Sequence, residues 1–262
     1  MYQLMVKIGD HLISMTTTSS EVQGWVLETY CVVDTGDETK VCDLHLHIEA
    51  GYGLPFANQA YKVSAEETSI IYERLDYQLA VERDFTRALL KVNEQISLKH
   101  AMMNLYSAFI VHRNWGLLIH SSCAIDGGRA HLFSGHSGAG KSTVARLSHP
   151  RMLLSDEATI VRIRAGQVDV LDSPFRSDTT PEFTAESFPL AAINLLQQSS
   201  RIFRKPLTTS EAILRMMDKS FYWAFSQQET QNILGLYKTL LHVVPVYELE
   251  FQKNDLFWEA IS

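Results

Sequence analysis

The stretch Gly135 to Thr143 reads Gly-His-Ser-Gly-Ala-Gly-Lys-Ser-Thr, which fits the pattern of a phosphate-binding loop: a glycine, four residues, then Gly-Lys-Ser. Its glycines allow left-handed backbone conformations, in which successive N–H groups turn inward toward an anion. Lys141 is long enough to reach the β- and γ-phosphates of a nucleotide, and the Ser142 hydroxyl follows at the position that binds Mg²⁺. The pattern predicts a nucleotide site formed by Gly135, Ser137, Gly138, Ala139, Gly140, Lys141, Ser142 and Thr143.

Carboxylates are needed as well, because phosphoryl transfer requires groups that hold Mg²⁺ and take a proton from the acceptor. Asp156 and Glu157 follow the apolar run 152–154, which we expect to be a strand beside the strand that enters the loop. Ligands gather at the carboxyl ends of strands in α/β sheets, and neighbouring residues at a strand end point apart. One acid could therefore hold the metal with Ser142 while the other faces the acceptor. Alternatively, Asp156 acts alone and Glu157 is a solvated loop carboxylate.

Two further side chains are candidates for the same site. His120 ends an expected strand one hairpin before the loop, where an imidazole could tune Asp156 by hydrogen bonding or charge, or could be an ordinary core histidine. Arg176 follows an expected strand end and could hold phosphate or an acidic acceptor. A second basic cluster, in an expected loop, consists of Arg201, Arg204 and Lys205. For all of these cations the alternative is a solvated surface charge.

The elements that must position these residues follow from hydrophobic periodicity and turn signals. A hairpin, 116–124 with 129–134, leads directly into the loop, and a short helix, 141–147, ends before Pro150. Thr208 and Glu211 form a capping-box pattern that predicts a helix start. The remaining expected elements are a hairpin over 158–171, helices over 208–217 and 230–242, and a strand over 246–251.

The N-terminal part reads as mostly β. We expect a hairpin of 23–33 with 39–48 around the turn 34–37, and strands within 69–81. His45 and His47 then share one strand face and could share a metal, although no third ligand is evident and two half-exposed histidines are the simpler interpretation. A helix over 97–112 follows. We therefore predict an α/β chain with a mixed α+β sheet, divided into a β-rich subdomain, 1–95, and a nucleotide-binding core, 96–262.

Composition excludes several classes of function. The net charge of −7 gives no general attraction to nucleic acid or anionic membranes. No apolar run reaches the roughly 20 residues of a membrane span, and the N-terminus lacks the pattern of a secretory signal. The three cysteines, Cys31, Cys42 and Cys123, show no metal or redox spacing. We expect a cytoplasmic protein with reduced thiols.

The runs LLIHSSCAIDGGRAHLFSGHSGAGKSTVARL and LLSDEATIV resemble the catalytic core of HPr kinase/phosphorylase. They resemble more closely the smaller HPr-kinase-like proteins of peptide natural-product pathways, including lasso peptide kinases. The resemblance is clearest over residues 98–200. It implies a P-loop kinase core of the type related to phosphoenolpyruvate carboxykinase, with a β-rich N-terminal subdomain that could dock the substrate.

By this resemblance Lys141 and Ser142 match the phosphate-binding Lys and the Mg²⁺-binding Ser, and His120 matches the active-site His. Asp156 matches the family's general base, and Glu157 stands where HPr kinase has a second Asp. The implied activity is ATP-dependent (or GTP-dependent) transfer of the γ-phosphate to a Ser or Thr of a peptide or small protein, such as a lasso-type precursor. The glycine-rich signature that accompanies phosphorylase activity and assembly in HPr kinase is not found, so reversibility and oligomeric state stay open. The alternative is a nucleotide-binding regulatory or assembly module that transfers nothing.

Overall fold

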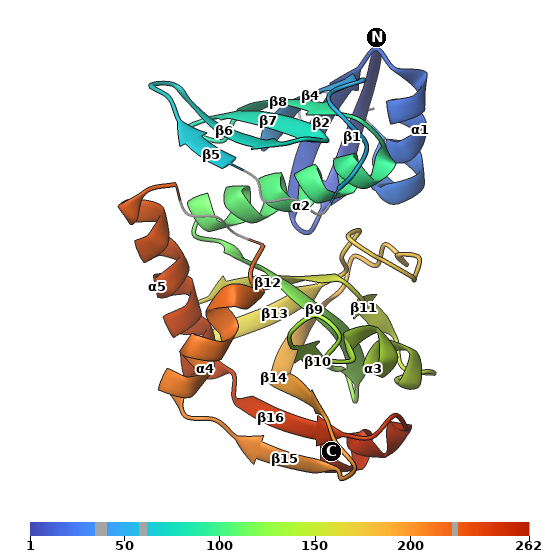
Figure 1. Cartoon of the computed structure of the whole chain (residues 1–262), viewed down its shortest axis with the longest axis vertical. Helices are drawn as coiled ribbons and strands as arrows, with labels where there is room; N and C mark the ends of the chain where they lie inside the picture. Colours follow the sequence, from blue (N-terminus) through green and yellow to red (C-terminus); the bar gives the residue numbers. More distant parts are fainter. Residues whose placement is uncertain (35–40, 58–61, 222–224, 262) are drawn as a thin grey trace. The chain divides into compact units, whose positions relative to one another are not determined.

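The computed structural model describes residues 1–34, 41–57, 62–221 and 225–261 of the chain. They form two compact units (Figure 1). The first comprises Met1–His112 with a short later stretch that ends at Glu229, and the second comprises the chain from Arg113 onward and again from Thr230. Each unit has its own mixed β-sheet, so the protein is a mixed α/β protein. The boundary expected near residue 95 falls one helix before the division between the units.

The sheet of the first unit has the strand order β3-β1-β2-β4-β8-β7-β6-β5. Strands β2, β4 and β8 are parallel neighbours, and the other pairs are antiparallel. The strands are β1 (Tyr2–Ile8), β2 (His11–Thr17), β3 (Cys31–Val32), β4 (Leu44–Ala50), β5 (Lys62–Ala65), β6 (Ser69–Arg74), β7 (Tyr77–Glu82) and β8 (Arg87–Val92).

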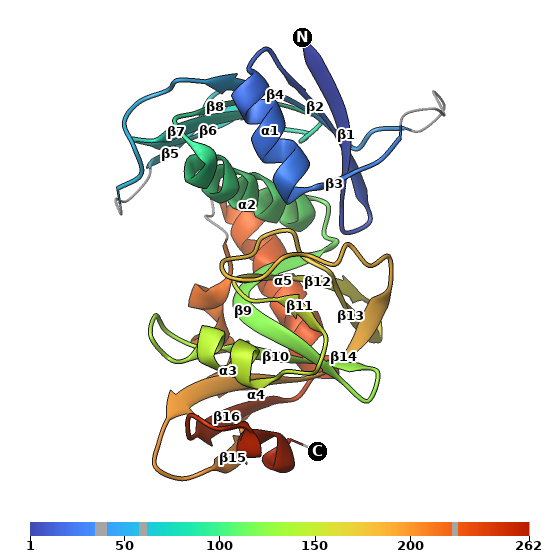
Figure 2. The ribbon, with the colours of Figure 1, turned by 90° about the vertical axis from the view of Figure 1, so that its right-hand side faces the viewer.

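Side chains alternate across this sheet as the sequence pattern indicates. In β4, Leu44, Leu46 and Ile48 are buried, whereas His45 and His47 lie on the open face. Helix α2 (Gln95–His112) packs against β7 and β8, as Figures 1 and 2 show. The predicted strands within 69–81 and the predicted helix over 97–112 are therefore confirmed.

The predicted hairpin of 23–33 with 39–48 is wrong. Most of its first strand is helix α1 (Ser20–Thr29), because the Ser19 hydroxyl caps the Val22 N–H and the spacing of Val22 and Val26 buries both on one helical face. Strand β4 pairs in parallel with β2 and β8 instead. Most of the turn expected at 34–37 lies outside the described residues.

The second sheet runs β10-β9-β12-β13-β14-β16-β15, with β11 on β9. Strand β10 also pairs with β14, so β10, β9, β12, β13 and β14 close into a ring of hydrogen-bonded strands. The strands are β9 (Gly116–Asp126), β10 (Arg129–Ser134), β11 (Leu153–Ser155), β12 (Ala158–Arg164), β13 (Gln167–Leu171), β14 (Ser187–Gln198), β15 (Phe203–Pro206) and β16 (Val246–Phe251).

The helices of this unit are short except for the last α-helix. They are α3 (Lys141–Leu147), α4 (Thr209–Met216), the 3₁₀ turn η1 (Met217–Lys219), α5 (Gln227–Val243), most of which belongs here, and η2 (Asp255–Ala260). Phe133, Val144, Phe251 and Trp258 belong to one buried cluster that joins β10, α3, β16 and η2. The predicted hairpins, the capping box at Thr208 and the closing strand are confirmed.

Candidate functional site

The glycine-rich loop, residues 135–140, joins the end of β10 to the first residue of α3 (Figure 2). Gly138 and Gly140 have φ angles of 79° and 111°, which side chains rarely adopt. A Cβ on Gly140 would also lie 2.6 Å from the Phe251 ring, and one on Gly135 would lie 2.7 Å from the Ala139 Cβ. Three of the glycines that define the motif are thus required by the local backbone and packing.

Lys141 occupies the inside of this loop. Its side chain is largely buried, and its Nζ donates hydrogen bonds to the carbonyl oxygens of Gly135 (3.2 Å) and His136 (3.3 Å). Burial, together with the nearby charge of Lys219, lowers the pKa of Lys141, while Glu157 opposes this shift. Ser142 follows at the start of α3 and is exposed. The lysine is therefore held where an anion bound by the loop would meet it.

Asp156 follows β11 and turns toward a different loop. Its carboxylate accepts hydrogen bonds from the backbone N–H groups of Ser177 (2.8 Å), Asp178 (2.8 Å) and Thr179 (2.9 Å), and the residue is almost completely buried. Both carboxylate oxygens thus hold the turn 177–179. Strand β11 pairs with β9 and not with β10, so the expectation that it lies beside the strand entering the glycine-rich loop is wrong.

Glu157 contacts the same turn as Asp156, through a side chain instead of the backbone. Its Oε2 accepts a hydrogen bond from the Ser177 hydroxyl at 2.8 Å. Its charge also raises the pKa values of His120 and Lys141, which places the carboxylate within electrostatic reach of both. Of the two acids, Glu157 is the one whose charge acts on the glycine-rich loop lysine.

His120 lies on β9, opposite Ala158 of β12, and its backbone oxygen accepts a hydrogen bond from the Ser134 hydroxyl at 2.7 Å. Burial and then the charge of Lys141 lower the pKa of His120 to about 4, with a smaller contribution from Lys219 and an opposing one from Glu157. The imidazole is therefore neutral at pH 7. His120, Lys141 and Glu157, which come from three separate segments, form one electrostatic cluster.

Lys219 is a further member of this cluster that sequence reasoning missed. It ends η1, and its charge contributes to the lowered pKa values of Lys141 and His120. A pocket of about 470 Å³ is lined by Gly135 and His136 of the glycine-rich loop together with Asp218 and Lys219. No motif marks Lys219 in the sequence, because its position depends on how a distant segment packs.

Arg176 holds the loop that follows β13. Its guanidinium donates to the Asp172 carboxylate (2.5 Å), to the carbonyl oxygens of Ser173 (2.9 Å) and Leu153 (3.0 Å), and to the Thr179 hydroxyl (3.0 Å). Both ends of the Arg176–Asp172 ion pair are buried. These contacts give Arg176 a structural role, and the expected contact with substrate stays a prediction.

The residues of the second basic cluster have partners of their own. Arg201 forms an ion pair with Glu250 at 2.7 Å. Arg204 stacks on the Tyr247 ring, 3.7 Å from its centroid. Arg204 and Lys205 lie in strand β15, so the expectation that the whole cluster occupies a loop is wrong.

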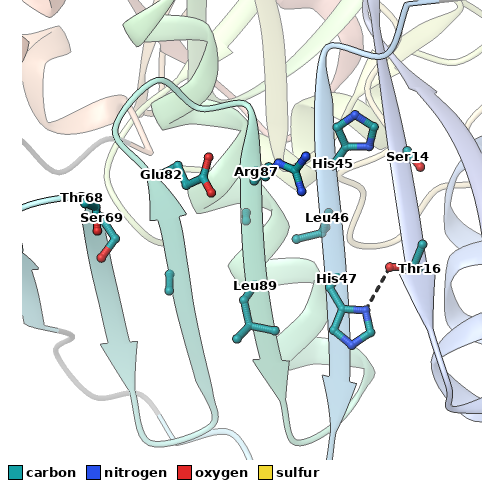
Figure 3. Close-up of a pocket in the computed structure, with 12 residues that line it drawn as sticks. Ser14, Thr16, His45, Leu46, His47, Thr68, Ser69, Glu82, Arg87 and Leu89 are labelled. Carbon is teal, nitrogen blue, oxygen red and sulfur yellow. Dashed lines mark hydrogen bonds between the residues drawn. The ribbon is translucent and has the colours of Figure 1, made fainter.

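The first unit has a pocket of its own, of about 580 Å³, on the open face of its sheet (Figure 3). His45 lies between Ser14 and Arg87 in the register, and the His47 ring forms a hydrogen bond with the Thr16 hydroxyl at 2.9 Å. Among the described residues, no group of three or more His, Cys, Asp or Glu side chains could hold a metal ion. A docking role for this unit stays a prediction.

No helix in the described part of the chain is both long and apolar enough to cross a membrane. Residues 88–262 match the model of a protein family described as ScmC: SynChlorMet cassette protein ScmC. The match covers more than half of the chain and includes every residue of the site around the glycine-rich loop. No curated protein matches the chain.

Proposed function

We propose that this chain, which belongs to the ScmC family of SynChlorMet cassette proteins, is an ATP-dependent phosphotransferase that moves the γ-phosphate to a Ser or Thr hydroxyl of a peptide or small protein. The observation that carries the proposal is the electrostatic cluster of Lys141, Glu157 and His120 at the glycine-rich loop. A phosphate-binding lysine beside a carboxylate that can take a proton supports phosphoryl transfer to an alcohol, and a neutral imidazole can assist by hydrogen bonding.

The residues present fit a nucleotide with Mg²⁺. The loop amides and Lys141 would hold the β- and γ-phosphates, and the exposed Ser142 hydroxyl lies at the motif position for the metal. Mg²⁺ usually keeps several waters and is bound by substrate phosphates with one or two carboxylates, so waters and phosphate oxygens would supply most of its ligands here. When bound, Mg²⁺ would neutralise charge on the transferring phosphate.

Glu157 is the carboxylate that we assign to the acceptor side. The oxygens of Asp156 already accept three backbone N–H bonds, whereas Glu157 acts electrostatically on Lys141 and His120. Glu157 would take the proton from the attacking hydroxyl. The sequence assigns this role to Asp156, whereas we propose the other member of the acidic pair as the base. The neutral His120 can orient Glu157 or the acceptor through a hydrogen bond without adding positive charge beside Lys141.

The sequence resemblance to HPr-kinase-like proteins supports the same reaction class, because the order of His120, hairpin, glycine-rich loop and acidic pair is shared. The hairpin of β9 and β10 leads directly into the loop, which suits a core of the HPr kinase and phosphoenolpyruvate carboxykinase type. By analogy the acceptor would be a precursor peptide of the lasso type, in the cytoplasm, with ATP or GTP as donor.

The test uses labelled ATP, Mg²⁺ and a pool of Ser- and Thr-containing peptides. Glu157→Gln should still bind nucleotide and should lose transfer by about 10²- to 10⁴-fold, the usual contribution of a positioned base. Lys141→Ala should lose nucleotide binding, and the exposed Glu259→Gln should match the wild type.

Wild-type transfer rates in Glu157→Gln would overturn the assignment of the base. Nucleotide binding with no transfer to any peptide would favour the regulatory or assembly module. A chain that binds no nucleotide would refute the proposed function.

A further inference from the structure

Two lysines approach the same site from distant parts of the chain. Lys141 follows the glycine-rich loop, and Lys219 ends η1, yet the charge of Lys219 acts on Lys141 and on His120. Bringing two ammonium groups together is unfavourable unless an anion lies between or beside them. Glu157 supplies one negative charge to the cluster, and Asp218, which pairs with Lys219 at 2.6 Å, supplies another. A bound phosphate would therefore share the Lys219 ammonium group with Asp218.

The backbone of residues 217–221 is fixed to the strand that carries His120. The Phe221 N–H donates to the Leu118 carbonyl oxygen at 3.1 Å, and Ser220 forms a β-bridge with Ile119. The Tyr237 hydroxyl hydrogen-bonds both the Met216 carbonyl oxygen, at 2.7 Å, and the Ser220 hydroxyl. The backbone on both sides of Lys219 is therefore held by β9 and α5.

The Lys219 ammonium group has one hydrogen-bond partner among the described residues, Asp218, and two further donors. Its neighbour Asp218 accepts one hydrogen bond from it at 2.6 Å, and the Asp218 side chain is 71% exposed, whereas that of Lys219 is 14% exposed. An ammonium group has three donors, so it can keep this contact and still bind phosphate. Lys219 also lines the pocket of about 470 Å³ that includes Gly135 and His136.

We propose that Lys219 binds the terminal phosphate of a nucleoside triphosphate and thereby makes the site select triphosphates over diphosphates. Lys141 and the loop amides would hold the β- and γ-phosphates from one direction, and Lys219 would add a contact to the γ-phosphate. Lys219 would reach the end of the phosphate chain from the side of β9, because Ser220 bridges Ile119, the neighbour of His120. The inference rests on the proposed function, since it needs a nucleotide in the glycine-rich loop.

The experiment measures binding by calorimetry, with Mg²⁺, of ADP and of an ATP analogue whose β,γ-bridge is a methylene. Lys219→Gln should weaken binding of the analogue by about 10- to 100-fold, the value of a charge-assisted hydrogen bond, and should weaken ADP binding by less than about threefold. Lys219→Arg should restore most of the preference for the analogue. Lys253→Gln, an exposed lysine elsewhere in the second unit, should bind both ligands like the wild type.

Equal losses for ADP and the analogue, or no loss for either, would overturn the role of Lys219. Thermal unfolding of Lys219→Gln and Lys219→Met identifies any variant that fails to fold, and the Lys219→Arg variant then decides the question. Failure of the wild type to bind either ligand would instead refute the proposed function. A wild type that binds both with no preference for the analogue overturns this inference alone.

Discussion

Replacing Asp156 by Asn tests whether its carboxylate acts as the anchor of the turn 177–179. One oxygen accepts the Ser177 N–H, and the other accepts the N–H groups of Asp178 and Thr179. An amide can keep only one of these oxygens. If its oxygen faces Asp178 and Thr179, its NH₂ group must face the Ser177 N–H, donor against donor.

The magnitude follows from these three bonds. Losing one bond and leaving its buried donor unsatisfied costs about 1–3 kcal/mol, and the two retained bonds weaken because the acceptor is no longer charged. We expect Asp156→Asn to lower the free energy of unfolding by about 2–4 kcal/mol in total, a large share of the 5–15 kcal/mol that is typical of a domain.

Urea unfolding at pH 7, followed by circular dichroism, measures this loss. Asp178→Asn is the matched control, because it removes an exposed carboxylate from the same turn while keeping the backbone N–H that Asp156 binds, and it should change stability by less than about 0.5 kcal/mol. An Asp156→Asn variant as stable as this control would refute the anchoring role. If the stable Asp156→Asn variant also lost phosphoryl transfer while binding nucleotide normally, Asp156 would be the base after all.

Two more predictions concern the glycine-rich loop and its histidine. Gly140→Ala should abolish nucleotide binding and should lower the unfolding temperature more than Gly166→Ala does. Both positions have positive φ, but only at Gly140 would the new Cβ meet a ring, that of Phe251. Equal losses of unfolding temperature in thermal scans would contradict this. Burial lowers the pKa values of both His120 and His131 from 6.5 to about 4. Between these pH values the unfolded chain therefore binds more protons than the folded chain, so the free energy of unfolding should fall as the pH drops from about 6.5 toward 4. Urea midpoints across this range should show a shallower dependence in His120→Gln, and an unchanged slope would count against the burial of that imidazole.

Local patterns allowed much of the second unit to be predicted. The hairpin before the glycine-rich loop, the short helix after it and the capping box at Thr208 each depend on residues that are close in sequence. The alternation in β4 likewise predicted that His45 and His47 share a face, because it depends on the two-residue period of one strand.

Features that depend on distant pairing could not be predicted in the same way. Residues 23–33 are rich in aromatic and β-branched side chains, which favour a strand, but the Ser19 cap and the packing of Val22 and Val26 give a helix. The direction in which Asp156 points depends on the pairing of β11 with β9 and on the turn 177–179. The position of Lys219 depends on the bridge of Ser220 to Ile119, which no local pattern signals.

A single residue, Ser177, touches both members of the acidic pair: its N–H bonds Asp156 and its hydroxyl bonds Glu157. A rearrangement of the segment 172–186 that moves Ser177 would therefore change its contacts with both carboxylates, including the one that acts on Lys141. If a nucleotide binds more tightly to one arrangement of this segment, its binding must shift the population toward that arrangement. The ratio of the two affinities sets the size of the shift. If a bound nucleotide favours one arrangement, proteolysis or hydrogen exchange at residues 172–186 would report on occupancy of the glycine-rich loop.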